Sequence, residues 1–455
     1  MVKTTEENFD YISQRALGNF EIYAPMRDAG TIAQEFIENG AKDLGVARNT
    51  LIRDLISAKV SSCLEFQPET DLPYGSSRGS VRLRKAFGEF YSKHMNTAEK
   101  VTEDHVIVAA GTGAALFHLT MVVADPGDVV LVPAPYYGNF DVHLRTSTGV
   151  DFVMTQPFSA SDFKIDFEKM EAAVKEAESN GKHVAAVLLA NPNNPLGRCH
   201  PEEDLKKLLQ FANSHSLHVI VDEIYALSTF GHFKNSAPPL PNPFVSILSI
   251  QNLKELIDPK LVHVVYGMSK DFGINGFRVS FAIDQYNSQL RNALVRESFV
   301  SHFSSISDRL IANILSDTTF LDKLIEGYQR AVDILESYDI PYYAAEAGHF
   351  IWIDARKFLI GAMLPPREPT TEDEVILWCY LLEGGVYVVP GHAFHAEKAG
   401  FFRATFALDW DTINPAWNLL CQLLTSFDIK AMEQAKKEEG EVLKKARGRD
   451  AILYE

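Results

Sequence analysis

Short apolar segments alternate with amphipathic stretches through the middle of the chain, and this alternation constrains the fold more than any other feature of the sequence. The predicted strands are Val106–Ala110, Val129–Pro133, Val184–Ala190, His218–Asp222 and Val262–Gly267. Stretches long enough for helices lie between them, among them Ala114–Val123, Phe167–Ala177 and Pro201–His215. Strands that alternate with helices form βαβ units, so we predict an α/β fold with a mainly parallel central sheet and helices on both faces.

The pattern changes after about residue 300. A long helical stretch, Leu310–Leu335, precedes short strands at Phe350–Asp354, Val386–Val389 and Phe402–Phe406, which predicts a smaller α+β domain. The length of 455 residues, about three times the ~150 of a usual domain, also favours two domains. We expect residues 60–300 to form the large domain and residues 301–455 the small one, with the N-terminal segment 1–59 joining the small domain.

Composition and charge argue against several classes of protein. The chain has 60 Asp and Glu against 43 Lys and Arg, and this net charge of −17 disfavours nucleic acid or an anionic membrane as a partner. No apolar run approaches the ~18 residues of a membrane span, and the N-terminus lacks the apolar core of a signal peptide, so we expect a cytoplasmic protein. The cysteines show no metal-ligand spacing, which favours reduced thiols and no metal site; they are Cys63, Cys199, Cys379 and Cys421.

Two loops that follow predicted strands carry candidate binding groups. The turn AAGTGAA places Gly111, Thr112 and Gly113 at the start of a helix, where backbone N–H groups bind anions. A plain strand-to-helix turn is the alternative. In ANPNNPLG, residues 190–197, two Asn-Pro steps hold the chain extended and expose Asn194 at the carboxyl end of a strand, where ligands of parallel sheets bind. A loop stiffened by proline is the alternative there.

Two further segments carry charged groups at strand ends. In HVIVDEIYALS, the strand ends at Asp222 and Tyr225 follows it; a buried carboxylate needs a cation, either a ligand or a structural arginine. In YGMSKDFGINGFRVS, residues 266–280, Lys270 follows Ser269 and precedes Arg278, which suits a nucleophilic amine beside an anion. A surface turn explains the lysine alone, but not the four segments in this order.

Taken together, these segments resemble the fold-type I enzymes that use pyridoxal 5′-phosphate, the aminotransferase class I/II family. The resemblance covers roughly residues 20–425, and within the family it is greatest to the 1-aminocyclopropane-1-carboxylate synthases. It rests on ADPGDVVLVPAPYYGNF (124–140), NPNNPLG, VDEIYALSTF, VYGMSKDFGINGFRVSF and VVPGHAFHAEKAGFFRATFA (388–407). The resemblance implies an aspartate aminotransferase-like fold, with pyridoxal 5′-phosphate bound in the large domain.

The resemblance also assigns a role to each matching residue. Lys270 bonds covalently to the cofactor and moves the Cα proton, and Asp222 pairs with the cofactor's ring nitrogen. Asn194 and Tyr225 hydrogen-bond the phenolic oxygen of the ring, and Tyr137 stacks on its face. The phosphate is held by the glycine-rich turn with the side chains that follow the lysine strand, namely Gly111, Thr112, Gly113, Ser269 and Arg278.

Two more residues are assigned in the same way. Tyr74, in LPYGSSRG, reaches a phosphate across the interface of a homodimer with shared active sites, and Arg403, in GFFR, clamps the α-carboxylate of an amino-acid substrate. The sequence departs from the family at two positions. Gly267 stands where a serine is common, which removes one hydroxyl donor worth about 1–2 kcal/mol. Arg48, in GVARNTL, stands where the synthases carry a glutamate near the substrate.

The second departure bears on the reaction. If Arg48 faces the site, a substrate with a second anionic or carbonyl group is favoured, and the cationic S-adenosylmethionine of the synthases is put in doubt; if it forms a local salt bridge, it has no such effect. The leading hypothesis is a lyase that cleaves a carbon–sulfur bond in an amino acid, as in the fungal synthase-like enzymes of secondary metabolism that the chain resembles. The alternatives are an aminotransferase or a 1-aminocyclopropane-1-carboxylate synthase, and a relative that binds the cofactor without turnover.

Overall fold

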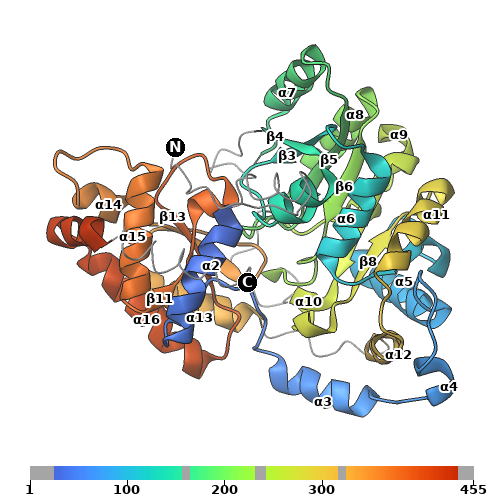
Figure 1. The fold of residues 1–455 in the computed structure, drawn as a ribbon, viewed down its shortest axis with the longest axis horizontal. Helices are drawn as coiled ribbons and strands as arrows, with labels where there is room; N and C mark the ends of the chain where they lie inside the picture. Colours follow the sequence, from blue (N-terminus) through green and yellow to red (C-terminus); the bar gives the residue numbers. More distant parts are fainter. Residues whose placement is uncertain (1–24, 156–163, 231–241, 316–323, 439–455) are drawn as a thin grey trace, which may run out of the picture.

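A seven-stranded sheet forms the centre of the larger half of the molecule (Figure 1). The computed structural model describes residues 25–155, 164–230, 242–315 and 324–438. The strand order is β2-β8-β7-β6-β5-β3-β4, and every neighbouring pair is parallel except those that β8 makes with β2 and β7. The strands are β2 Val106–Ala109, β3 Val129–Pro133, β4 Asp151–Thr155, β5 Val184–Ala190, β6 His218–Asp222, β7 Val262–Gly267 and β8 Ser280–Ile283. The prediction of a mainly parallel α/β sheet is confirmed.

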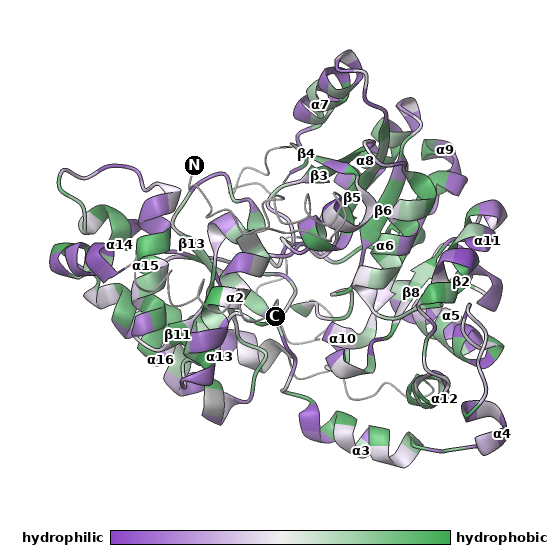
Figure 2. Ribbon diagram, viewed as in Figure 1, coloured by the Kyte–Doolittle hydropathy of each residue, from purple (hydrophilic) through white to green (hydrophobic). Residues whose placement is uncertain are grey.

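Helices cover both faces of this sheet because its strands are apolar on both sides. Along β2, Val106 and Val108 belong to one hydrophobic core, while Ile107 and Ala109 belong to the other. The first core also packs α5 Val81–Met95, α7 Phe167–Ser179 and α8 Glu202–Ser214, and the second packs α6 Thr112–Val123 and α11 Ser288–Glu297. Figure 2 shows the hydrophobic colour concentrated in the strands and on α6.

A smaller antiparallel sheet lies in the other half, with the strand order β12-β13-β10-β9. Its strands are β9 Tyr342–Tyr343, β10 Phe350–Asp354, β12 Val389–Pro390 and β13 Phe401–Thr405, and its flanking helices are α13 Leu324–Ser337, α14 Arg356–Gly361, α15 Thr371–Glu383 and α16 Trp410–Ser426. The N-terminal α2 Pro25–Glu38 lies beside these elements, and β1 Lys42–Asp43 pairs with β11 Val386–Tyr387 (Figure 1). The domain boundaries 1–59, 60–300 and 301–455 stay predictions.

Two expectations about single elements were wrong, and two strands were not predicted. The predicted helix Leu310–Leu335 is two helices, because α12 Ser305–Ile314 ends before α13 begins. The predicted strand Val386–Val389 is divided between two sheets, since β11 pairs with β1 and β12 pairs with β13. Strands β4 and β8 were missed: β4 is a half-buried edge strand of mixed composition, and β8 is short.

The described residues place two further limits on the molecule. None of their helices is both apolar enough and long enough to pass through a membrane, and cytoplasmic location stays a prediction. No three His, Cys, Asp or Glu side chains within the described ranges gather as metal ligands. The four cysteines are free thiols, and all but the half-buried Cys63 are buried.

Candidate active site

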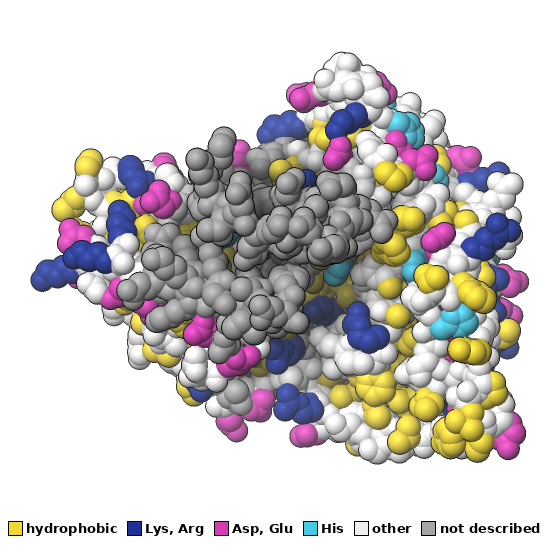
Figure 3. Space-filling model, in the orientation of Figure 1, with side chains coloured by type: hydrophobic (Ala, Val, Ile, Leu, Met, Phe, Trp, Pro, Cys, Tyr) yellow, Lys and Arg dark blue, Asp and Glu magenta, His cyan; other side chains and the backbone are white. Residues whose placement is uncertain are grey.

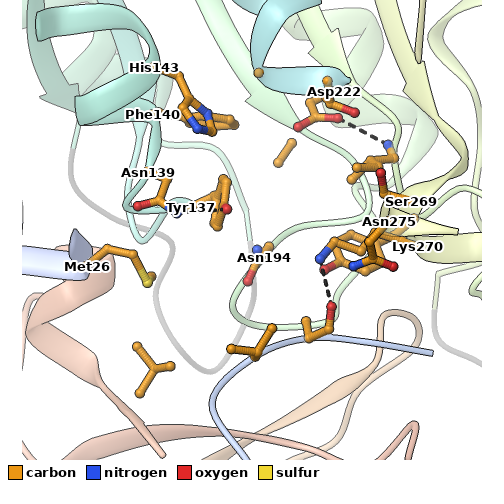
Figure 4. Close-up of a pocket in the computed structure, with 18 of the residues that line it drawn as sticks. Met26, Tyr137, Asn139, Phe140, His143, Asn194, Asp222, Ser269, Lys270 and Asn275 are labelled. Carbon is orange, nitrogen blue, oxygen red and sulfur yellow. Dashed lines mark hydrogen bonds between the residues drawn. The ribbon is translucent and has the colours of Figure 1, made fainter. Parts of the chain in front are cut away.

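The carboxyl ends of three neighbouring parallel strands deliver polar side chains to one cavity of about 300 Å³. Asn194 follows β5, Asp222 ends β6, and Lys270 follows β7 in the short helix α10 Met268–Asp271. Figure 4 shows Asp222, Ser269 and Lys270 on one side of this cavity, facing Tyr137, Phe140 and His143 on the other. Ten predicted site residues line it: Thr112, Gly113, Tyr137, Asn194, Asp222, Tyr225, Ser269, Lys270, Arg278 and Arg403.

Lys270 and Asp222 are buried groups whose pKa values move in opposite directions. Burial, followed by the nearby charge of Arg403, lowers the pKa of Lys270 to about 7. Burial raises the pKa of Asp222 to about 7, against the opposing effects of a hydrogen bond from the Ile224 amide and the charge of Lys270. Lys270 Nζ donates to the Ala47 carbonyl at 2.7 Å. The site therefore holds an amine that loses its proton readily and a carboxyl group whose ionised form needs a cation.

The turn before α6 forms a cradle for an anion with Arg278. Gly111 has a φ of 98°, and a Cβ atom there would lie 2.0 Å from the Arg278 guanidinium, so only glycine permits this approach. Beside it, the Thr112 hydroxyl is buried and has no hydrogen-bond partner within the described residues. Guanidinium, hydroxyl and the N-terminal amides of a helix together bind phosphate-like groups.

Gly267 also contacts this cradle. A Cβ atom on Gly267 would lie 2.3 Å from Thr112 Oγ1. The glycine therefore makes room for the threonine hydroxyl. The sequence predicts only the loss of a hydroxyl donor at position 267, but the structure packs the Thr112 hydroxyl against this glycine.

Arg403, on β13, points into the cavity from the smaller sheet. Its guanidinium lies 4.9 Å from the ring centres of both Phe350 and Phe394, and it donates to Asn194 Oδ1 at 2.9 Å. It also donates to the Gly45 carbonyl, and its Nε atom is buried without a partner in the part of the chain described. A guanidinium fixed in this way presents a charged donor to a carboxylate.

Arg48 lies outside this cavity. Its guanidinium pairs with Asp43 at 2.6 Å, and its side chain is 52% exposed. It borders a neighbouring cavity together with Asn49 and Arg53. Arg48 therefore forms the local salt bridge, and it does not face the active-site cavity.

Several residues of the site could not be recognised from the sequence. The carbonyl groups of Gly45 and Ala47 hold Arg403 and Lys270, and a backbone atom leaves no signal in residue type. His143 also lines the cavity, and burial lowers its pKa, with a smaller effect from Arg278. Tyr74 does not line the cavity of its own chain. This residue is 96% exposed, and the centroid of its ring lies 6.1 Å from that of the His302 ring in a T-shaped contact.

Known proteins are similar to this chain in sequence and in fold. The model of the family "Aminotransferase class I and II" matches residues 46–418. The chain belongs to this family. It is 32% identical to 1-aminocyclopropane-1-carboxylate synthase 6 of Arabidopsis thaliana over 83% of this chain and 77% of the relative, and 30% identical to synthase 1 of Cucurbita pepo over 86% and 80%. A human relative, named a probable inactive synthase-like protein, is 29% identical over 88% of this chain and 70% of its own.

Solved structures of aspartate aminotransferases have the same fold. The enzyme of Thermotoga maritima has a TM-score of 0.73 at 20% identity, covering 91% of this chain and 100% of that one. A double mutant of the Thermus thermophilus enzyme has a TM-score of 0.71 at 20% identity, covering 90% and 99%. The aspartate aminotransferase-like fold expected of this aminotransferase class I/II protein is thereby confirmed.

Enzymes of the class I/II family depend on pyridoxal 5′-phosphate, and the cavity fits that cofactor. Two of its hydroxyl groups, on Thr112 and Tyr225, are buried and unpartnered among the described residues, as a site shaped for a polar ligand requires. The Arg278 cradle would hold the phosphate and Asp222 the ring nitrogen, which supplies the cation that this carboxylate needs. Bound there, the cofactor provides an electron sink for a carbanion at the substrate Cα.

The remaining steps, binding of the substrate and transfer of its proton, would fall to side chains of the cavity. Arg403, which lines the cavity, would bind the substrate carboxylate and so orient the Cα–H bond. Lys270, whose amine has a pKa near 7, can accept and return the Cα proton, a role typically worth about 10²–10⁴-fold in rate. Tyr137 lines the cavity opposite Lys270 (Figure 4) and restricts the space for water.

Proposed function

We propose that this enzyme is a pyridoxal-phosphate-dependent lyase that cleaves the carbon–sulfur bond of an amino acid. The observation that supports the proposal is that the cavity is lined by several apolar side chains and few acidic groups. Among the described lining residues Asp222 is the sole carboxylate, and the apolar side chains include Met26, Leu116, Phe140 and Val389. A neutral thioether suits such a wall, whereas a sulfonium ion would find no carboxylate apart from the one required by the ring nitrogen.

The placement of Arg48 bears on the alternatives. Its guanidinium is already paired with Asp43 outside the cavity, so a second substrate carboxylate gains no free cation from it. The proposal therefore favours an uncharged side chain over the dicarboxylic substrates of an aspartate-type aminotransferase. An aminotransferase for neutral amino acids would use the same residues, and experiment has to separate the two.

The proposed reaction is a β-elimination. Arg403 holds the α-carboxylate, Lys270 removes the Cα proton, and the Cβ–S electron pair leaves with the sulfur as a thiolate, which takes up a proton. Addition of water to the remaining unsaturated amino acid releases ammonia and a 2-oxo acid. No oxidant or reductant is needed, because the electrons of the broken C–H bond form the new double bond.

An S-substituted cysteine tests the proposal. We expect purified enzyme to release thiol, ammonia and 2-oxo acid in equal amounts, measured by thiol titration and two coupled assays. The control is the Arg403→Leu variant assayed with the same cysteine derivative. Its KM should rise strongly, because the substrate carboxylate loses its guanidinium partner. If the substrate instead converts the cofactor to its stable amine form without thiol release, the enzyme is an aminotransferase. Formation of 1-aminocyclopropane-1-carboxylate from S-adenosylmethionine would likewise contradict the proposal.

The proposal includes a homodimer with shared active sites. Large apolar side chains are exposed around α12, and Figure 3 shows yellow side chains gathered where Figure 1 draws α12 and α4 Pro68–Asp71. They form an apolar patch of Leu64, Phe66, Leu72, Tyr74, Phe299, Val300 and Ile306. An exposed patch of this kind marks an interface, and it contains Tyr74, whose family role requires a second subunit.

A further inference from the structure

A buried chain of hydrogen bonds lies directly behind the active-site cavity. Asp271, next to the reactive Lys270, accepts hydrogen bonds from the Ser228 hydroxyl, from the Leu227 amide at 3.0 Å and from the Tyr266 hydroxyl at 2.9 Å. Ser228 Oγ lies 2.8 Å from His349 Nε2. Asp271, Ser228 and His349 are all buried, and none of them lines the cavity.

The donors in this chain can be assigned. Burial raises the pKa of Asp271 to about 7. While Asp271 is ionised, the single hydroxyl hydrogen of Ser228 goes to it, so Ser228 Oγ accepts from His349 Nε2. The His349 ring is therefore the tautomer with its proton on Nε2. Burial and the charges of Lys270 and Arg403 hold the pKa of His349 well below its ordinary value, so the ring is neutral.

The chain meets the cavity at Tyr225. The His349 ring packs edge-on against the Tyr225 ring, with the centroids 5.3 Å apart and the planes at 88°. Tyr225 and Ser228 belong to one turn, in which the Ser228 amide donates to the Tyr225 carbonyl at 3.0 Å. Asp271 thus ties the turn that carries Tyr225 to the helix that carries Lys270.

The same chain reaches the strand of Arg403. The His349 carbonyl accepts a hydrogen bond from the Thr405 hydroxyl at 2.7 Å and another from the Phe406 amide at 2.8 Å. Thr405 is the last residue of β13, and Phe406 follows it directly. The Gly348 amide donates to the Ser228 carbonyl at 2.8 Å, and Thr229 forms a β-bridge with Ala347. The segment around His349 is therefore held between the large sheet and the small one.

We infer that Asp271, Ser228 and His349 act as positioning residues, which set Tyr225 and Lys270 in place relative to the strand that carries Arg403. Each of the three active-site groups comes from a different part of the chain: the turn after β6, the helix after β7, and β13. The buried hydrogen-bond chain is the structure that contacts all three parts. Its function is independent of which amino acid the enzyme uses.

Ser228→Ala tests this inference with Ser246→Ala as the matched control. Ser246 is an equally buried serine, whose hydroxyl contacts Tyr91 in a separate network. In the holoenzyme we expect Ser228→Ala to speed amide hydrogen exchange about tenfold in peptides covering 227–230, 347–350 and 405–407, because one buried hydrogen bond has been lost. Ser246→Ala should lower the Tm by a similar amount but leave the exchange rates of those peptides unchanged. Equal exchange in both variants would overturn the inference.

A second pair of variants separates positioning from packing. His349→Gln keeps an N–H donor near the position of Nε2, whereas His349→Leu keeps the volume without the donor. We expect the pH midpoint of the cofactor's visible absorbance to stay near the wild-type value with glutamine. With leucine it should move upward by about half a unit or more, because Tyr225 is no longer held to stabilise the unprotonated form. An equal midpoint in both variants would contradict the inference. Neither measurement uses a substrate, so the outcome is independent of the proposed lyase reaction.

Discussion

At the level of single residues, we propose that Lys270 bonds to the cofactor and moves the substrate proton. Its pKa near 7 makes the amine available as a nucleophile and as a base. Lys270→Ala should prevent covalent attachment of the cofactor, measured as intact mass after borohydride reduction, and should lower turnover by about 10²-fold or more. The control is Lys206→Ala, which changes a half-buried lysine on α8 that pairs with Glu202. A Lys270→Ala enzyme that still binds the cofactor covalently would assign the linkage to another residue.

Asp222 makes the cofactor-free protein sensitive to pH. A carboxyl group whose folded pKa is about 7 instead of 3.8 takes up protons on folding, so its contribution to stability decreases as the pH rises from about 4 to 7. Asp222→Asn removes the free-energy cost of burying the ionised carboxylate. We expect the cofactor-free variant to be more stable than wild type at pH 8, by on the order of 1–3 kcal/mol, with the difference shrinking toward pH 4.

The measurement is the Tm of the cofactor-free protein at several pH values. The exposed Asp104→Asn serves as the control, since the Asp104 side chain is 79% exposed. The same Asp222→Asn variant should bind pyridoxal 5′-phosphate at least about tenfold more weakly, because the ring nitrogen loses its charged partner. Unchanged binding would remove Asp222 from the cofactor site.

At the level of elements, the junction of β7 with the start of α6 shapes the cradle that we propose holds the phosphate. Since a side chain at 267 would displace the Thr112 hydroxyl, Gly267→Ser should weaken cofactor binding, by about tenfold, rather than restore a missing donor. Gly276→Ser is the control, because nothing lies within 4 Å of a Cβ atom there. Equilibrium dialysis with the cofactor decides the point, and tighter binding by Gly267→Ser would show that the cradle can accommodate both hydroxyls.

The same scale explains which elements could be predicted. Strands β3, β5, β6 and β7 have the predicted bounds, because strands buried on both faces form continuous apolar runs. The edge strand β4 lacks such a run, since four of its five residues are only half-buried or exposed. The end of α12 was missed although four polar residues, 316–319, follow Leu315, because apolar residues resume at Phe320 and Leu321.

At the level of the whole molecule, the apolar patch around α12 predicts a dimer. Light scattering should give twice the 50.8 kDa of one chain. Val300→Asp places a charge in the patch, at a side chain that is 87% exposed, and should yield a monomer that retains the cofactor less well because Tyr74 of a second subunit is lost. Leu364→Asp, at an exposed position in the loop before α15, should change neither property. A wild-type monomer with full cofactor affinity would contradict the shared site.

The sequence by itself determined the fold class, the family and most of the cavity's polar side chains. Asn194, Asp222 and Lys270 lie at or just after the ends of buried apolar strands, and parallel strands end at one edge of the sheet. Arg403, on the antiparallel strand β13, was identified through the family resemblance of its motif. Tertiary structure alone decided that Arg48 pairs with Asp43, that the Gly45 and Ala47 carbonyls hold Arg403 and Lys270, and that Ser228 joins Asp271 to His349. These contacts depend on where distant backbone segments meet and how side chains turn, and neither leaves a pattern in the order of residues.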